Sequence, residues 1–561
     1  MQLVAYGAMD LYLTGNPQIT YFKLVYRRHT NFATEYIEQP FEKLPNFSTT
    51  QESIVTCNVD RNADLLHDCY LIYDLPAIYG CPLSKFRWVP YLGHNIIEKV
   101  SILIAGNLVD EQYGQWLNIW SELTLSDEKK RRYYNMIGHN YSIHTAPNLN
   151  PVNNLDNEAD DNDIDLNVSL CAGQDNTLLY PSKRLYIPLM FWFCTNPGLA
   201  IPLISLQYME VFIQVEFNPL NKLFLLGSKG ADSSDYDSCL GYNPLNYFLE
   251  GQKGSLKNET DKQFYEYMNG LNITYRNIFY YFISPGNDNL NLNNWKQNSY
   301  ILANYIYLGN DERKMFANNS QDYLITKVQR NKFTGLKDGP NTIELNLMHP
   351  VKELIWVLQK NVQNGNNYNN NYTLYDNIPR YNNYIDYISN HLLFNNTRNN
   401  NGLNQSIANI SNNVQKYNNY YNETVTSRNP YLFDKYGDIM LSSYLKFNGH
   451  DRFSERGSGF FSDLQIYKYH TGSPNVDGIY VYSFAEKPED HQPSGTCNMS
   501  RIEKVEMFLR LKNYLDIEDL TAIQDNPSLA LSFSDYNMYL YAPTYNVLRF
   551  MSGMASLVFS N

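Results

Sequence analysis

The strongest constraint on the fold is a two-residue alternation of apolar and other side chains that recurs along the chain. Residues 211–217 read VFIQVEF and residues 505–511 read VEMFLRL, so every second side chain is apolar. This period places alternate side chains on opposite faces of a β-strand and predicts strands with one buried face. Residues 354–358 read LIWVL, which predicts a strand covered on both faces. The chain is therefore expected to be built from β-sheets.

Helical periodicity is sparse by comparison. The best case is one helical face, followed by Ser126, a residue type that often caps a helix. The face consists of Trp116, Ile119, Trp120 and Leu123. Aromatic residues make up 15% of the chain, with 49 tyrosines, and such side chains fit a pleated, half-buried surface better than a helix. We expect an all-β fold with a few short helices and long loops.

The length of 561 residues exceeds the size at which one hydrophobic core keeps growing, so two domains are expected. The two halves also contain a faint repeat. Residues 94–104 resemble residues 349–358, and residues 209–213 resemble residues 505–509, in the same order. The repeat predicts two similar β domains in tandem, with a boundary after residue 220.

The segment 361–430 has a composition of its own, because 24 of its 70 residues are Asn. Such a polar segment supplies little apolar surface for a core. It reflects either codon drift in an AT-rich genome or an exposed loop that tolerates change. Both interpretations place it outside the folded β domains.

The charge balance excludes some functions. The net charge is -13, whereas a protein that coats nucleic acid needs basic surface to displace phosphate counterions. Direct binding of a genome is therefore not expected. The dense basic spots are Arg27 with Arg28 and the run 129–132, and a run of this kind is expected to form a solvated helix face.

Catalytic and metal-binding motifs are missing from the sequence. It has no phosphate-binding glycine loop, no G-x-S-x-G and no H-E-x-x-H, and its seven cysteines are scattered without a C-x-x-C pair. We expect no catalytic residues, no cofactor, no metal site and reduced thiols. The N-terminus lacks the basic and apolar regions of a signal peptide, so folding in a cytoplasm is expected.

Several longer motifs carry a family resemblance. They are QLVAYGAMDLYLTGNPQIT (2–20), YRRHTNF (26–32), DER (311–313), HPVKELIW (349–356), NGHDRF (448–453), YVYSFA (480–485), HQPSGTCN (491–498), YNVLR (545–549) and MSGM (551–554). Together they resemble the major capsid proteins of nucleocytoplasmic large DNA viruses. The matches are spread over both halves of the chain.

This resemblance implies two tandem eight-stranded jelly rolls and no catalytic activity. It also implies homotrimers that form pseudo-hexagonal capsomers and tile an icosahedral shell around an internal membrane. The implied protein is a late structural component of the outer capsid of the virion, assembled in the host cytoplasm. Its implied partners are other copies of itself, minor capsid and penton proteins and the internal membrane.

Two other functions stay open at this point. One is a jelly-roll protein that binds carbohydrate or attaches the virion to its host through exposed Tyr and Asn side chains. The other is a glycan-processing enzyme that uses two carboxylates on a β scaffold. Stable trimers without turnover of glycans would favour the hypothesis of a capsid protein.

The domain organisation combines the repeat with the resemblance. We expect an N-terminal arm (1–32), a first jelly roll (33–220), a linker with a variable loop (221–270) and a second jelly roll (271–561). The Asn-rich segment 361–430 is expected to be a surface loop of the second jelly roll.

Two sets of residues are candidate sites. Lys23, Arg27, Arg28 and His29 form a basic cluster in an acidic chain, which either contacts an inner acidic partner or pairs with the chain's own carboxylates. The second set consists of N-x-[ST] sequons as candidate surface glycosylation sites, which would need cytoplasmic machinery. These sequons are Asn371, Asn395, Asn404, Asn409 and Asn422.

Overall fold

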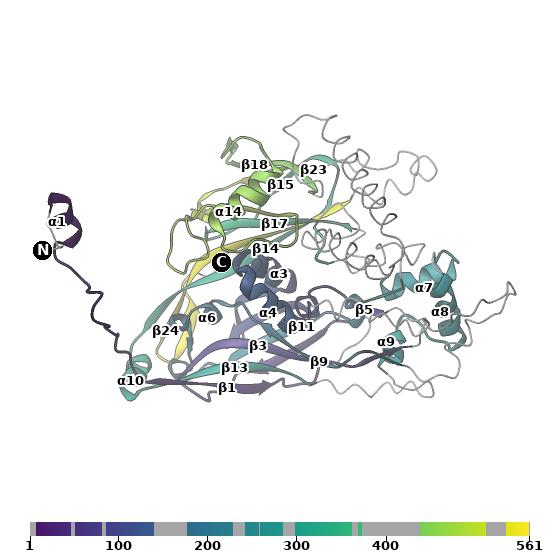
Figure 1. Ribbon diagram of the computed structural model, residues 1–561, viewed down its shortest axis with the longest axis horizontal. Helices are drawn as coiled ribbons and strands as arrows, with labels where there is room; N and C mark the ends of the chain where they lie inside the picture. The colour runs from purple at the N-terminus through teal and green to yellow at the C-terminus, as the bar shows by residue number, and fades with distance from the viewer. Residues whose placement is uncertain are drawn as a thin grey trace, which may run out of the picture.

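The structure is a computed structural model that describes residues 7–45, 51–80, 86–139, 177–227, 242–256, 259–283, 298–361, 369–372, 438–511 and 535–559. The chain forms two β-sandwiches, one above the other in Figure 1, with an N-terminal arm that leaves the first sandwich.

Two antiparallel sheets make up the first sandwich. One sheet has the order β1 (Phe32–Pro40), β13 (Ser299–Leu308), β3 (Leu65–Leu75), with β9 (Lys183–Pro188) and β10 (Ile201–Pro202) both on the far side of β3. The other has the order β2 (Ser53–Asn58), β11 (Val211–Phe217), β6 (Ile97–Ile104), β7 (Asn107–Tyr113). Two separate two-stranded sheets also belong to this half: β4 (Ile78–Gly80) with β8 (Thr177–Tyr180), and β5 (Phe86–Trp88) with β12 (Phe224–Leu226).

The second sandwich repeats this strand order. One sheet runs β14 (Gln321–Leu336), β24 (Tyr536–Met551), β17 (Glu353–Lys360), β21 (Ile479–Ser483), and the short strands β16 (Pro350–Val351), β22 (Cys497–Asn498) and β25 (Met554–Leu557) extend it. The other runs β15 (Gly339–Glu344), β23 (Val505–Leu511), β18 (Met440–Phe447), β19 (His450–Asp451), with β20 (Arg456–Gly457) also on β18. In each half, counting eight main strands in chain order, the sheets read 1-8-3-6 and 2-7-4-5, which is the double-sheet topology of a jelly roll.

The predicted alternation is confirmed in these strands. Along β11 and β23 every second residue is buried, and the residues between them are partly or fully exposed. All eight residues of β17 are buried, as expected for a strand covered on both sides. Its side chains alternate between two cores: Trp356 packs inside the second sandwich, whereas Ile355 and Val357 join the core that extends from the first.

The predicted repeat is half right. β11 and β23 are both the seventh strand of their jelly roll, as the similarity of 209–213 to 505–509 predicted. Residues 94–104 lead into β6, a fourth strand, whereas residues 349–358 lead into β17, a third strand, so that pairing was wrong. Both segments are buried apolar strands, and this shared environment produces similar sequences at positions that are not equivalent.

The strand pairing corrects the expected start of the second jelly roll at residue 271. β13 lies between β1 and β3 and is the eighth strand of the first jelly roll. Ile301, Ala303 and Tyr305 point from it into the first core. The expected linker 221–270 is therefore part of a long connection between the seventh and eighth strands. Length and composition could not show that the chain returns to close the first sandwich.

The helices are short, as expected. The predicted helical face lies in α3, and Ser126 is the N-cap of α4, although its side chain makes no capping hydrogen bond. Among the described residues the helices are α1 (Ala8–Thr14), α2 (Leu92–Ile96), α3 (Gly114–Thr124), α4 (Asp127–Ile137), α6 (Trp192–Thr195), α7 (Pro244–Gln252), α8 (Glu259–Gly270), α9 (Ile278–Phe282), α10 (Asn310–Asn318) and α14 (Gln465–Tyr469). The 3₁₀ turns are η1 (Pro197–Leu199), η2 (Leu203–Ser205), η3 (Leu220–Lys222) and η7 (Met499–Arg501), and η6 (Phe460–Leu464) is a π-helix that runs into α14. Within the described ranges, no helix is long and apolar enough to span a bilayer.

Part of the Asn-rich segment belongs to the folded body. Asn370 accepts a hydrogen bond of 2.8 Å from Asn95, and Tyr372 is fully buried in the first core. The expectation that the whole of 361–430 lies outside the β domains was therefore wrong for residues 369–372. Its residues 373–430 lie outside the described residues.

Candidate functional site

The most elaborate side-chain arrangement lies at the seam between the two sandwiches, where α3 and α4 are placed (Figure 1). Trp116 stacks on Trp120 at a centroid distance of 5.1 Å and packs against Tyr541 of β24 at 5.3 Å. The Tyr541 hydroxyl donates a 2.8 Å hydrogen bond to Gln115. α3 thus covers the outer face of the β14-β24-β17-β21 sheet, which is why β17 is buried on both sides.

The C-terminal end of α3 holds a loop of the second sandwich. The Gly472 N–H donates to the carbonyl of Leu123 at 2.8 Å, and the Thr471 hydroxyl lies 2.9 Å from the carbonyl of Thr124. The last carbonyls of a helix lack partners within the helix, so the loop satisfies them. A Cβ on Gly472 would lie 2.7–2.8 Å from three carbonyl oxygens, so only glycine fits this approach.

Glu122 supplies a buried charge to the same seam. Its carboxylate lies 3.4 Å from the Lys130 ammonium, accepts a 2.5 Å hydrogen bond from the Tyr134 hydroxyl and accepts a 3.0 Å bond from the N–H of Asn475. Lys130 also donates to the carbonyl of Ser473. Lys130 was expected on a solvated face with the rest of 129–132, but it is buried, with its charge paired to Glu122 of the same half and its hydrogen bond to Ser473 crossing the seam.

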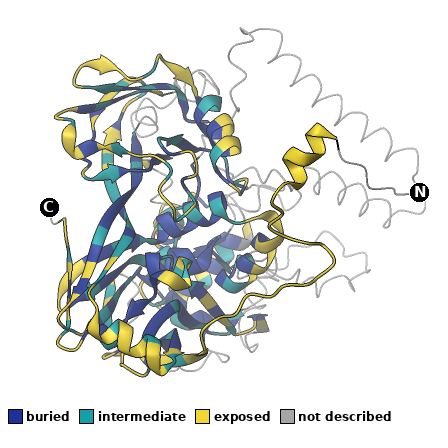
Figure 2. Cartoon of the chain, turned by 90° about the vertical axis from the view of Figure 1, so that its left-hand side faces the viewer, coloured by how far each residue is buried: buried dark blue, intermediate teal, exposed yellow. Residues whose placement is uncertain are grey.

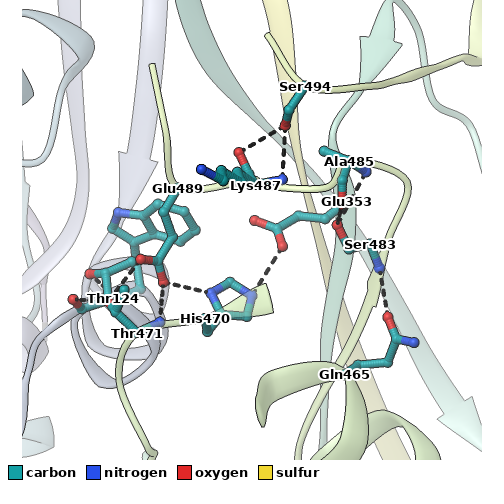
Figure 3. Close-up of polar contacts among 11 residues, drawn as sticks. Thr124, Glu353, Gln465, His470, Thr471, Ser483, Ala485, Lys487, Glu489 and Ser494 are labelled. Carbon is teal, nitrogen blue, oxygen red and sulfur yellow. Dashed lines mark hydrogen bonds and ion pairs between the residues drawn. The ribbon is translucent and has the colours of Figure 1, made fainter. Parts of the chain in front are cut away.

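His470 occupies a second buried charge cluster (Figure 3). Its Nε2 lies 3.1 Å from a carboxylate oxygen of Glu353, and its Nδ1 lies 3.0 Å from Glu489. Burial by itself would lower the pKa of His470, but the two carboxylates outweigh it and raise the pKa to about 9. The imidazole is therefore protonated at neutral pH. Its ring also makes a T-shaped contact with Trp120 of α3, with the ring centroids 6.3 Å apart.

Asp110 lies where β7 meets β14. The side chain is buried and accepts a 3.3 Å hydrogen bond from the N–H of Val328. Burial raises the pKa of Asp110 to about 7, against the opposite effects of that hydrogen bond and of Lys327. Close by, the Arg330 guanidinium lies 3.4 Å from the centroid of the Tyr113 ring. The seam therefore combines aromatic packing with charged groups from both halves.

This arrangement suits rigid attachment of the two halves. Each charged group described above is engaged in contacts within or across the seam. In the part of the chain that the structure describes, no group of three or more His, Cys, Asp or Glu side chains could hold a metal ion. Sequence reasoning missed His470, Glu353 and Glu122 as interacting groups. The available signal was Glu353 at the edge of a long apolar run, which marks a charge that needs a partner.

The structure places the predicted basic cluster on the exposed arm (Figure 2). Lys23, Arg27, Arg28 and His29 are all exposed, and His29 contacts its neighbours Thr30 and Phe32. No ion pair joins these basic residues to a carboxylate among the described residues. The arm also exposes large apolar side chains, which are Met9, Leu11, Tyr12, Leu13, Ile19, Tyr21, Phe22, Leu24, Val25 and Tyr26.

One candidate glycosylation site is corrected by the structure. Asn371 is fully buried, so its side chain has no room for a glycan in the folded chain. Its neighbours Asn370 and Tyr372 are buried for the same reason, because this short piece packs against the first sandwich. The sequons at Asn395, Asn404, Asn409 and Asn422 lie outside the described residues.

Comparisons with known proteins agree with this architecture. Residues 312–556 match the family described as large eukaryotic DNA virus major capsid protein, and residues 20–241 match the family described as major capsid protein N-terminus. The major capsid protein of Phaeocystis pouchetii virus is 34% identical over 602 residues, covering 100% of this chain and 99% of the relative. That of Pyramimonas orientalis virus is 32% identical over 584 residues, again with 100% and 99% covered.

Solved structures show the same fold. The chain in the quasi-atomic model of the PBCV-1 virus capsid matches with a TM-score of 0.59 at 24% identity, covering 97% of this chain and 100% of that one. The faustovirus major capsid protein matches with a TM-score of 0.56 at 12% identity, covering 97% and 94%. The predicted double jelly roll is thereby confirmed. The chain belongs to the major capsid proteins of large eukaryotic DNA viruses, and it is a structural component of the virion capsid and not an enzyme.

Proposed function

We propose that three copies of the chain form a capsomer of pseudo-hexagonal outline and that such capsomers tile an icosahedral shell. The observation that carries the proposal is the identical strand order of the two sandwiches, joined by a seam with buried charges on both sides. A rigid subunit with two similar halves presents two similar units, so a closed ring of three subunits presents six. Six similar units around one axis have a hexagonal outline, and hexagons can tile a plane.

We also propose three structural units for this role. The arm extends to residue 31, the first jelly roll comprises the strands from β1 to β13, and the second comprises those from β14 to β25. The pairing of β13 with β1 and β3 supports this division. The two family matches also support it, because the first ends at residue 241 and the second begins at residue 312.

The exposed arm is the proposed contact with the inside of the shell. Its apolar side chains and its basic cluster suit an anionic lipid surface of an internal membrane or an acidic minor capsid protein. Near an anionic membrane each basic residue contributes about 1 kcal/mol, and salt weakens the attraction. Assembly in the host cytoplasm, with minor capsid and penton proteins, completes the proposal. The four free thiols among the described cysteines fit such a reducing compartment.

Light scattering of the purified chain tests the capsomer. The expected mass is three times 65.3 kDa, and negative-stain images should show particles with a six-sided outline. A chain that stays monomeric at high concentration would contradict the proposal.

Flotation with vesicles tests the arm. Arg27→Gln with Arg28→Gln should keep the trimer mass but weaken binding to anionic vesicles, more strongly at low salt. Lys129→Gln with Arg131→Gln is the matched control, because it removes two exposed charges from α4. If neither pair changes vesicle binding, an acidic inner capsid protein is the remaining partner to test by pull-down. Loss of trimers in the arm variant would show that the arm's charge serves the subunit itself.

A further inference from the structure

The two jelly rolls differ in what covers their equivalent sheets. In the second, the outer face of the β14-β24-β17-β21 sheet is covered by α3 of the first, through Trp116 against Tyr541. The equivalent sheet of the first is β1-β13-β3-β9. Tyr70 and Tyr186 alternate along its strands with core residues, so they point outward. α10 packs on the other end of this outer face, where Phe316 contacts the cluster of Leu65 and Ile306.

This open surface is here called the tyrosine face. It consists of the outward side chains of Tyr36, Tyr70, Tyr186, Glu38 and Asp68. Tyr36 and Tyr186 are 52% and 40% exposed, and the rings of Tyr36 and Tyr70 lie 6.3 Å apart. Tyrosine combines a large apolar area with a polar hydroxyl, which is why it is common at protein interfaces that are solvated before the partner binds.

The covered face has the opposite composition. Its outward side chains include Ile355, Val357, Ile479, Val481 and Tyr541, all fully or almost fully buried. A face that is always covered within its own chain can be wholly apolar. A face that is covered only after assembly is exposed to water in the unassembled subunit, which must stay soluble. The mixed aromatic and acidic tyrosine face meets that condition.

The second jelly roll carries an unused counterpart of α3. In the first, α3 and α4 lie in the connection between the fifth and sixth strands; in the second, the same connection holds η6 and α14. Leu464, Tyr467 and Lys468 are exposed there at the spacing i, i+3, i+4, so they share one side of the helix. Tyr467 is 90% exposed and Leu464 is 51% exposed. This side of the helix is therefore largely open to solvent in the single subunit.

We propose that η6 and α14 of one subunit pack on the tyrosine face of the next subunit. The contact between subunits then repeats the seam within each subunit, with Tyr467 and Leu464 in the place of the α3 tryptophans. Lys468 brings a positive charge toward Glu38 and Asp68. The contact is heterologous, because it joins two different surfaces, and a closed ring of three uses each surface once per subunit. This inference rests on the proposed trimer and names the surfaces that build it.

Two variants test the pairing, one on each surface. Tyr467→Glu alters the helix, and Tyr186→Glu alters the face; both side chains are well exposed, so each variant should keep the thermal unfolding of the parent. Each alone should raise the dissociation constant of the trimer at least about thirtyfold, as loss of an interface anchor does. Tyr208→Glu is the matched control, since Tyr208 is 78% exposed elsewhere on the surface.

Mixing the two variants gives the decisive result. The Tyr186→Glu chain keeps an intact helix surface, and the Tyr467→Glu chain keeps an intact tyrosine face. The mixture should therefore form a one-to-one dimer of 130.6 kDa, twice 65.3 kDa, and no trimer. Trimers that persist in either single variant would overturn the proposal. Two monomeric variants that fail to dimerise on mixing would also overturn it, because the two surfaces would then not meet. A monomeric parent chain would instead refute the proposed capsomer.

Discussion

His470→Gln should destabilise the chain in a pH-dependent way. The substitution removes the cation that lies between the carboxylates of Glu353 and Glu489, since Nε2 and Nδ1 of His470 lie 3.1 and 3.0 Å from them. Removing one partner from a buried charge cluster costs about 3–5 kcal/mol. The protonated imidazole is therefore expected to be a main stabilising group of the seam.

The pKa gives an independent magnitude. In the folded chain the pKa of His470 is about 9, because its two carboxylates outweigh the effect of burial, whereas an exposed histidine has a pKa of about 6.5. The folded state therefore binds the proton more tightly than the unfolded state. The gap corresponds to about 3 kcal/mol, which is fully present below pH 6.5 and is lost as the pH rises through 9.

Chemical denaturation at pH 6 and pH 10 measures both effects. The difference in unfolding free energy between the parent and His470→Gln should be about 3 kcal/mol or more at pH 6 and should shrink at pH 10. His450→Gln is the control, since His450 is exposed at the start of β19. A difference below 1 kcal/mol at pH 6, or one that does not change with pH, would refute the assigned role of the cluster.

Four further predictions concern the seam and the Asn-rich segment. Gly472→Ala should lower the unfolding free energy by about 2 kcal/mol or more, measured by thermal unfolding, because its Cβ would meet helix carbonyls at 2.7–2.8 Å. Burial raises the pKa of Asp110 to about 7, so stability falls as the pH rises through 7; Asp110→Asn should therefore stabilise the chain by more than about 1 kcal/mol at pH 8 and less at pH 5. Replacing 374–436 with a short Gly-Ser linker should leave the melting temperature nearly unchanged, since closure entropy depends weakly on loop length. Replacing 361–430 should lower it, because that removes the buried Tyr372 and costs about 3–5 kcal/mol.

The domain boundary shows where sequence reasoning stopped. Apolar periodicity identified β11, β17 and β23, and it also identified α3 from its spaced tryptophans. It could not show that β13 returns to the first sandwich, because strand alternation reports burial and says nothing of the neighbour. For the same reason the sequence comparison aligned β6 with β17, two buried strands at different places in the topology.

The sequence by itself determined the local properties of this protein. The two-residue period set the strands, the missing motifs argued against catalysis, and the family motifs predicted two jelly rolls. Only the tertiary structure decided which groups meet at the seam. His470, Glu353 and Glu489 come from separate segments, and Lys130 looked like part of a solvated charge run until folding buried it beside Glu122. Burial and charge pairing depend on distances between segments far apart in the chain, and those distances exist only once both sandwiches have closed.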